Sequence, residues 1–197
     1  MMTSRSEYRL VLRQDNADER LTPVGYEIGL ISEQRYQKFL QRQEMKKAEI
    51  NRLKNTSIAP NDELNEILVS RETAPLATGI REYTLLKRPQ LNYSIIKKFD
   101  ENAPNLPNDI VEQIEVEIKY EGYIQKQLKQ VEQVKKLESK ALPSDFDYKE
   151  ITGLRLEAQE KLNKIKPLNI GQASRISGVS PADISVLLIW LATKKGN

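Results

Sequence analysis

The last part of the chain, residues 171–191, carries a dense set of signals for two short helices joined by a tight turn. Gly178 stands where a helix ends in a left-handed residue. Ser180 then caps a second helix, Pro181 takes its first position, and Asp183 completes a capping box. Apolar residues follow at helical spacing on one side: Ile184, Leu187, Leu188 and Leu191. The stretch therefore predicts a helical hairpin that must bury one face.

The rest of the chain also reads mainly as helix. The first helix of the hairpin should begin after Asn169, a capping residue, and stop at Ser177. Upstream, capping residues, prolines and apolar spacing predict six further helices. They open at Thr22-Pro23, after Ser32 (33–54), after Asn61, near Gly79 (to Pro89), near Asp109 (to Ala141) and near Leu154 (to Ile165).

Residues 3–13 leave two alternatives open. Tyr8, Leu10 and Leu12 alternate with charged residues, which is the period of a half-buried strand. Arg5, Arg9 and Arg13 are four residues apart, which also fits one face of a helix. The expected fold class is predominantly all-α, a multi-helix domain with a C-terminal helical-hairpin subdomain and, as one alternative, a short strand near the N-terminus.

Prolines mark a candidate boundary between subdomains. Pro104 and Pro107 stand among Asn and Asp residues in the segment 92–108. We therefore expect three parts: a junction at 1–22, a helical subdomain at 23–108, and the long helix with the C-terminal helical subdomain at 109–197.

Two absences from the composition exclude much common chemistry. The chain has no His and no Cys, so it offers no imidazole or thiolate metal site and no Ser-His or Cys nucleophile. Its eight glycines form neither a dinucleotide-binding motif nor a P-loop. The longest apolar run, 184–192, is far shorter than the roughly 20 residues of a membrane span. We expect a binding or assembly module without catalytic, metal or cofactor residues and without a membrane partner.

Charge is concentrated at the C-terminal end. Residues 161–197 carry six basic residues and one acidic residue, a net of +5, whereas residues 55–160 carry fourteen and nineteen, a net of −5. Phosphate contact and simple solubilisation are both open for these cations. The candidates for contact with phosphates or a partner in this segment are Lys161, Lys164, Lys166, Arg175, Lys194 and Lys195.

A second candidate group lies on the long helix. Lys119, Tyr120, Tyr123 and Lys126 interleave basic and aromatic residues, as RNA-binding platforms do. Tyrosines at helical spacing are more often found in a core or an interface, and we favour that interpretation.

The hairpin also has the spacing of a helix-turn-helix DNA reader. Its second helix begins with Pro181, Ala182 and Asp183, where a DNA reader usually places Arg, Asn or Gln. An independent nucleic-acid-binding regulator is therefore the alternative rather than the first hypothesis.

Four blocks of sequence carry a family resemblance. TSRSEYRLVLRQDNADERLT (3–22), LKRPQLNY (86–93), EIKYEGYIQKQ (117–127) and GQASRISGVSP (171–181) occur in the order found in the C-terminal region of the MnmG, or GidA, family. Together they span almost the whole chain, which resembles that region.

The resemblance implies a function. MnmG proteins are cytoplasmic flavoproteins that use FAD and NADH and act with the GTPase MnmE. They place a carboxymethylaminomethyl or aminomethyl group on C5 of the wobble uridine of certain tRNAs. Their flavin domain precedes the region seen here, their C-terminal region is associated with tRNA and MnmE binding, and they form homodimers largely through other regions. The chain is then an interaction domain that is not itself catalytic.

Two roles are considered for the arginines of the first block. Arg5, Arg9, Arg13 and Arg20 lie where the chain would join the flavin domain. Pairing with the acidic residues of the same block is the default, and direct tRNA contact is the alternative. The acidic residues are Glu7, Asp15, Asp18 and Glu19.

We predict that the purified chain is colourless and binds neither FAD nor NADH, because its glycines form no phosphate-binding loop. The measurement is the visible absorbance of the purified chain. Stoichiometric flavin absorbance would contradict the prediction.

Overall fold

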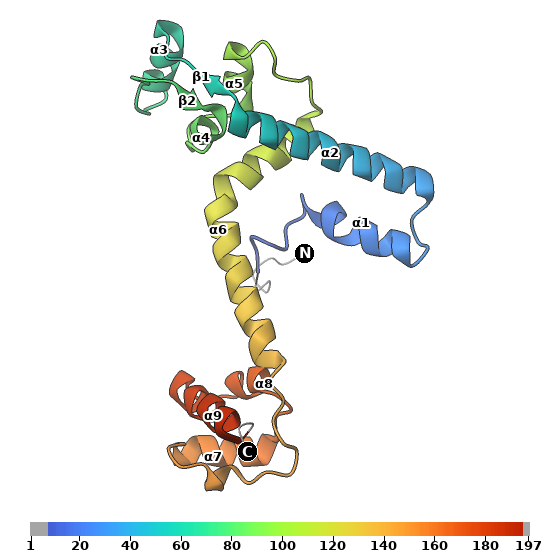
Figure 1. Cartoon of the computed structure of the whole chain (residues 1–197), viewed down its shortest axis with the longest axis vertical. Helices are drawn as coiled ribbons and strands as arrows, with labels where there is room; N and C mark the ends of the chain where they lie inside the picture. Colours follow the sequence, from blue (N-terminus) through green and yellow to red (C-terminus); the bar gives the residue numbers. More distant parts are fainter. Residues whose placement is uncertain (1–7, 195–197) are drawn as a thin grey trace. The chain divides into compact units, whose positions relative to one another are not determined.

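The computed structural model describes residues 8–194, and these are mostly helical, as expected (Figure 1). The elements in order are α1 (Ala17–Glu27), α2 (Glu33–Asn55), β1 (Ser57–Ile58), α3 (Asp62–Ser70), β2 (Ile80–Arg81), α4 (Glu82–Leu86), α5 (Tyr93–Phe99), α6 (Asn108–Glu138), the 3-10 helix η2 (Tyr148–Glu150), α7 (Leu156–Ile165), α8 (Ile170–Ser174) and α9 (Pro181–Lys194).

The chain divides into two compact units within α6. The first extends to Gln127 and the second begins at Leu128. The proline-rich segment 92–108, where the sequence places a boundary, lies inside the first unit.

The first unit has its core between α2, α3, α4, α5 and the first half of α6. Fully buried side chains come from each of these helices, among them Leu53, Leu64, Leu85, Ile96 and Ile114. Short strands β1 and β2 pair antiparallel, with Ser57 opposite Arg81 and Ile58 opposite Ile80. The sequence predicts a loop at 55–60 and a helix from Gly79. The loop prediction is wrong at residues 57–58, which form strand β1. The helix begins only at Glu82, because residues 80–81 pair with β1.

The N-terminal boundary of α1 also differs from expectation. The helix begins at Ala17, five residues before Thr22, and Pro23 lies inside it. The Asn16 carboxamide oxygen accepts hydrogen bonds from Arg13 N at 3.2 Å and Arg20 Nε at 3.1 Å, which ties the preceding turn to the helix. This contact explains the earlier start.

Residues 8–13 form neither of the expected elements. They make turns, and Leu10 and Val11 both donate backbone N–H groups to Gln127 Oε1 at 3.0 Å. A side chain of α6 therefore takes the place of a strand partner. Residues 3–7 of the predicted strand or helix lie outside the described residues.

A charged cluster is enclosed in the first unit. Arg52 on α2 lies within salt-bridge distance of Glu49 (2.8 Å) and Glu82 (3.3 Å), and it also pairs with Asp100. The Tyr93 hydroxyl donates to Glu49 Oε1 at 2.9 Å. One cation thus serves three buried carboxylates. Burial, together with the neighbouring Asp100 carboxylate, raises the pKa of Glu82 from 4.5 to about 7, although Arg52 opposes the shift.

We predict that Glu82→Gln removes part of the pH dependence of stability. The unfolded chain loses the Glu82 proton near pH 4.5 and the folded chain near pH 7, so the wild type loses stability as pH rises between these values. Relative to the variant, the wild type should lose about 1 to 2 kcal/mol between pH 5 and 8, measured by urea unfolding. Glu66→Gln, an exposed control on α3, should follow the wild-type curve. Parallel curves for Glu82→Gln and wild type would contradict the prediction.

The second unit is built around the predicted hairpin. Its core includes Tyr148, Leu162, Ile170, Ile184 and Leu187, and the Phe146 ring lies 4.3 Å from the Trp190 ring between centroids. The long helix ends at Glu138, three residues before expectation, and α7 begins two residues later than expected.

The N-cap signals of the hairpin are confirmed, whereas Gly178 is left-handed as expected but does not end the first helix. Asn169 Oδ1 accepts from Gln172 N at 2.8 Å, and Gly178 has φ +96°. Helix α8 ends at Ser174 rather than Ser177, because the N–H groups of Arg175 and Ile176 each bond a carbonyl three residues back and tighten the chain into turns.

Asp183 does more than complete the capping box. Its carboxylate accepts from Ser180 N at 2.8 Å and from Arg155 Nη2 at 2.6 Å, and Arg155 Nη2 also donates to Gly178 O at 3.1 Å. The carboxylate is almost fully buried. Hydrogen bonds from Arg155 and Ser180 hold the pKa of Asp183 well below its usual range, despite burial. Asp183 therefore joins the start of α7 to the start of α9.

We predict that Asp183→Asn destabilises the second unit by about 2 kcal/mol at pH 7, because it removes a charge-assisted pair and weakens a helix cap. The lowered pKa of Asp183 means that its contribution is present above pH 4 and is lost as pH falls further. The difference between variant and wild type in thermal unfolding should therefore shrink below pH 4. Asp145→Asn, at an exposed turn position, is the control. An unchanged melting temperature at pH 7 would contradict the prediction.

Candidate functional site

The basic residues of the C-terminal segment differ in how far they contact the rest of the protein. Lys161 and Lys164 lie three residues apart on α7, and both are exposed. Lys166 follows α7 in a left-handed conformation, with φ 51°. Its Nζ donates to Phe146 O and lies 5.7 Å from the centroid of the Tyr148 ring. Lys166 therefore has a structural role, whereas Lys161 and Lys164 present charge to solvent.

Arg175 is exposed but paired. Its Nη1 lies 2.8 Å from Glu138 Oε1, and both side chains are about half exposed. Gly171 permits this approach, because a Cβ there would lie 2.4 Å from Glu138 Cγ. An exposed ion pair of this kind contributes little to stability and can exchange for an external phosphate or carboxylate.

The remaining two cations of the segment cannot be placed in the same way. Lys194 ends α9 as the last described residue, and Lys195 lies outside the described residues.

Burial of Asp183 makes the exposed surface of the segment more basic than the sequence indicates. Asp183 is the one acidic residue between 161 and 197, and its charge is compensated by Arg155. The described part of this segment therefore presents no exposed carboxylate of its own. Its exposed acidic neighbours in sequence or in contact include Glu157 and Glu160 on α7, Glu138 on α6, and Asp147, which accepts from Asn163 Nδ2 at 2.7 Å.

The second candidate group separates into two kinds of residue. Lys119 Nζ donates to Leu91 O and lies 3.4 Å from Glu115, so this lysine holds α6 against the segment before α5. Tyr120 and Tyr123 are exposed, with ring centroids 6.4 Å apart and planes tilted by 52°. The core interpretation of these tyrosines is wrong, and an interface or RNA contact remains open. Lys126 is exposed on the next turn.

Gly122 lies beside these tyrosines and faces open space. A Cβ there would meet no atom within 4 Å, so no close helix approach explains this glycine.

Two arginines of the N-terminal block, Arg13 and Arg20, make local contacts, while Arg9 is exposed. Arg13 Nε lies 3.0 Å from Asp15 Oδ1, and Arg20 donates to Asn16 Oδ1 at 3.1 Å and to Arg13 O at 3.1 Å. Glu19 pairs with Lys46 on α2 rather than with an arginine of its own block. Arg5 lies outside the described residues.

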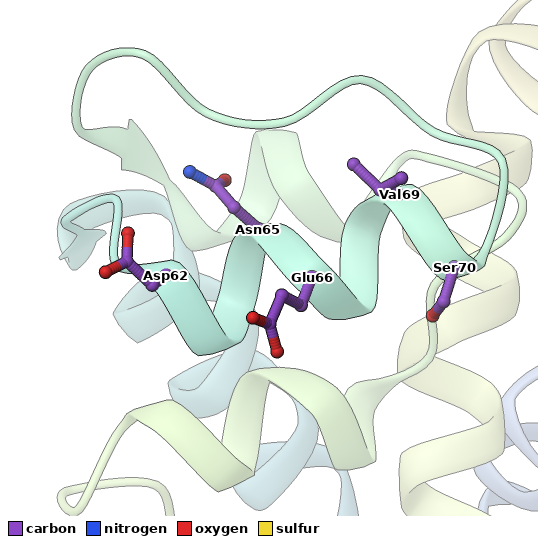
Figure 2. Close-up of a pocket in the computed structure, with 5 residues that line it drawn as sticks. All are labelled: Asp62, Asn65, Glu66, Val69 and Ser70. Atoms are coloured by element: carbon purple, nitrogen blue, oxygen red, sulfur yellow. The ribbon is translucent and has the colours of Figure 1, made fainter.

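A hollow of about 590 Å³ on the surface of α3 is a poor match for a nucleic acid (Figure 2). Asp62, Asn65, Glu66, Val69 and Ser70 line it, and none of these carries a positive charge. The Asn65 carboxamide is already used, because it donates to Leu76 O at 3.1 Å and accepts from Leu76 N at 2.7 Å. The hollow lacks a converging set of free polar groups.

Sequence reasoning misses the partners of the buried charges. Arg155 and Asp183 are 28 residues apart, and Arg52 and Asp100 are 48 apart. Only the capping position of Asp183 is signalled locally.

Within residues 8–194, no three His, Cys, Asp or Glu residues are grouped to hold a metal ion. In the same range, no helix has the length and apolar character needed to cross a membrane.

Two family models match consecutive parts of the chain. A tRNA modifying enzyme MnmG/GidA C-terminal helical domain matches residues 33–128, and an MnmG/GidA C-terminal helical bundle matches residues 130–197. Their border coincides with the division between the two units within α6.

Similar proteins agree with these models. Two relatives carry the name tRNA uridine 5-carboxymethylaminomethyl modification enzyme MnmG. The protein of Caldicellulosiruptor saccharolyticus is 58% identical over 100% of the chain and 32% of its own length. The protein of Clostridium novyi is 59% identical over 97% of the chain and 30% of its own length. A solved structure of Aquifex aeolicus GidA is 35% identical, with a TM-score of 0.67 over 95% of the chain and 29% of that protein. The chain spans about a third of the length of these relatives. It therefore belongs to the MnmG/GidA family of tRNA-modifying enzymes and corresponds to the C-terminal helical domains of that family.

Proposed function

We propose that the chain is the C-terminal interaction region of an FAD-dependent enzyme that installs a carboxymethylaminomethyl group on C5 of the tRNA wobble uridine. In this proposal the region contributes binding of tRNA and of the MnmE GTPase and supplies no catalytic group. The names of the relatives give the class of modified nucleoside, and because the relatives are about three times as long, the chemistry is left to other parts of the enzyme.

The observation that carries the tRNA-binding part is the exposure of two lysines on α7, beside Glu157 and Glu160 of the same helix, in a segment whose described part presents no exposed carboxylate of its own. The one acidic residue of the segment 161–197 is buried and paired, while Lys161 and Lys164 are exposed. Each lysine that neutralises a phosphate releases counterions and adds salt-dependent affinity. The exposed pair Arg175 and Glu138 supports a second contact, with either a phosphate or a partner carboxylate.

The residues of this chain do not fit a flavin or nicotinamide site. A dinucleotide pyrophosphate needs a glycine-rich turn between a strand and a helix, and no such motif occurs in the sequence. The three described glycines with positive φ, Gly29, Gly153 and Gly178, belong to separate turns. FAD and NADH are therefore assigned to the preceding part of the enzyme. The homodimer contacts are assigned there as well. With tRNA as the substrate, a cytoplasmic location is expected.

The alternative is an independent nucleic-acid-binding regulator that uses the hairpin. Such a reader needs free polar side chains at the start of its second helix. In α9 the first charged residue, Asp183, is buried against Arg155. This geometry and the family membership favour the tRNA-modifying enzyme.

We predict that Lys161→Ala with Lys164→Ala weakens tRNA affinity about tenfold and lowers the salt slope by about one unit for each lost phosphate contact. Binding of tRNA is measured at several salt concentrations on the full enzyme. The matched control removes the same charge from the exposed Lys38 and Lys47 of α2, and should leave the slope unchanged. Equal slopes for the two double variants would contradict a specific role for α7.

A second pair of variants separates tRNA from MnmE at the exposed ion pair. Arg175→Ala should weaken tRNA binding if the guanidinium meets phosphate, while Glu138→Ala should leave it equal or stronger. If Arg175 instead faces MnmE, tRNA binding stays at the wild-type value and the MnmE complex dissociates faster. No change in either measurement would contradict a binding role for Arg175.

A further inference from the structure

Helix α1 shows an inverted arrangement of polar and apolar residues. A helix that packs on a neighbour normally turns its apolar stripe inward. In α1 the one buried residue is Thr22, while Leu21, Val24 and the C-cap residue Ile28 are 60%, 53% and 64% exposed. These three positions have the spacing i, i+3, i+7, so they form one stripe on the outer side.

Polar and aromatic contacts, rather than aliphatic ones, hold α1 against α2. Lys46 on α2 pairs with Glu19, and it also lies 2.9 Å from Glu117 on α6. The Tyr26 ring stacks on Tyr36 of α2, with centroids 4.0 Å apart and planes within 5°. The orientation of the helix is thus fixed by contacts that leave the aliphatic stripe outside.

The end of the stripe is also held in place. Leu30 and Ile31 both donate backbone N–H groups to Gly25 O, at 2.8 and 3.1 Å. Leu30, 79% exposed, extends the stripe beyond the helix. We define the α1 stripe as Leu21, Val24, Ile28 and Leu30.

We propose that the α1 stripe docks on the part of the same polypeptide that precedes this region in the longer family proteins. The proposal rests on the proposed function, in which the chain is the C-terminal region of such an enzyme. Relatives are about three times as long, and the matching models are C-terminal, so the additional length precedes α1, the first element of the structure.

Size and charge argue against other occupants. The stripe offers roughly 400 Å² of apolar surface, about half of what each partner contributes to a stable interface between separate chains. A tethered domain needs less area, because its effective concentration reaches the millimolar range. Phosphates are disfavoured as well, since α1 carries Asp18, Glu19 and Glu27 against one basic residue, Arg20, which is engaged internally.

The experiment uses the absence of cysteine from the chain. Val24→Cys places a thiol in the α1 stripe, and Val69→Cys places a control thiol on α3, where Val69 is 60% exposed. Maleimide labelling rates are measured by peptide mass spectrometry for each variant, both in the 197-residue chain and in the full-length gene product without tRNA. The thiol at position 24 should react at least tenfold more slowly in the full-length product, and the thiol at position 69 should change less than twofold.

Three outcomes overturn the docking proposal, and a fourth separates it from the tRNA-binding role. Equal reactivity at position 24 in both proteins shows an open stripe. A rate in the isolated chain that falls with concentration, together with a dimer in sedimentation, assigns the stripe to a second copy. A natural gene product of only 22.7 kDa removes the preceding part and the proposed function together. Protection at position 24 with an unchanged tRNA salt slope in the α7 variants would remove only the tRNA-binding role.

Discussion

The first unit depends on one guanidinium. Arg52 meets carboxylates from α2, α4 and the end of α5, namely Glu49, Glu82 and Asp100. A buried charge without a partner costs several kcal/mol, so these three elements must meet at Arg52 or leave carboxylates uncompensated. The surrounding leucines and isoleucines supply the free energy of burial, and the cluster selects which helix faces meet. Burial first, and the neighbouring Asp100 and Glu49 carboxylates second, raise the pKa of Glu82 to about 7 against the opposing effect of Arg52.

The second unit uses the same principle on a smaller scale, and its consequence reaches the surface. The Asp183 carboxylate is engaged by Arg155 at the start of α7 and by Ser180 at the start of α9. Because this carboxylate is unavailable outside, the described part of segment 161–197 adds no exposed acid to Glu157 and Glu160, which lie one turn before Lys161 and Lys164 on the same helix. An interaction needed for folding thus prepares the basic surface to which the proposed tRNA contact is assigned.

Helix α1 differs from both units in leaving apolar side chains exposed. Its polar contacts with α2 are satisfied, but its aliphatic stripe is exposed. A helix with fixed orientation and an exposed stripe is complete in hydrogen bonding and incomplete in hydrophobic burial. The lengths of the relatives account for the second property if a preceding domain covers the stripe.

The sequence alone determined the features that depend on groups within a few residues of each other. The caps at Asn61, Asn169 and Ser180 and the left-handed Gly178 could all be predicted, because each is set by a side chain and the backbone of the next turn. The basic character of the C-terminal segment was equally readable. Tertiary structure decided the pairing of β1 with β2, the exposure of Tyr123 and the partner of Asp183. Those outcomes depend on groups brought together across dozens of residues, and no local pattern encodes which of many similar charges and apolar side chains will meet.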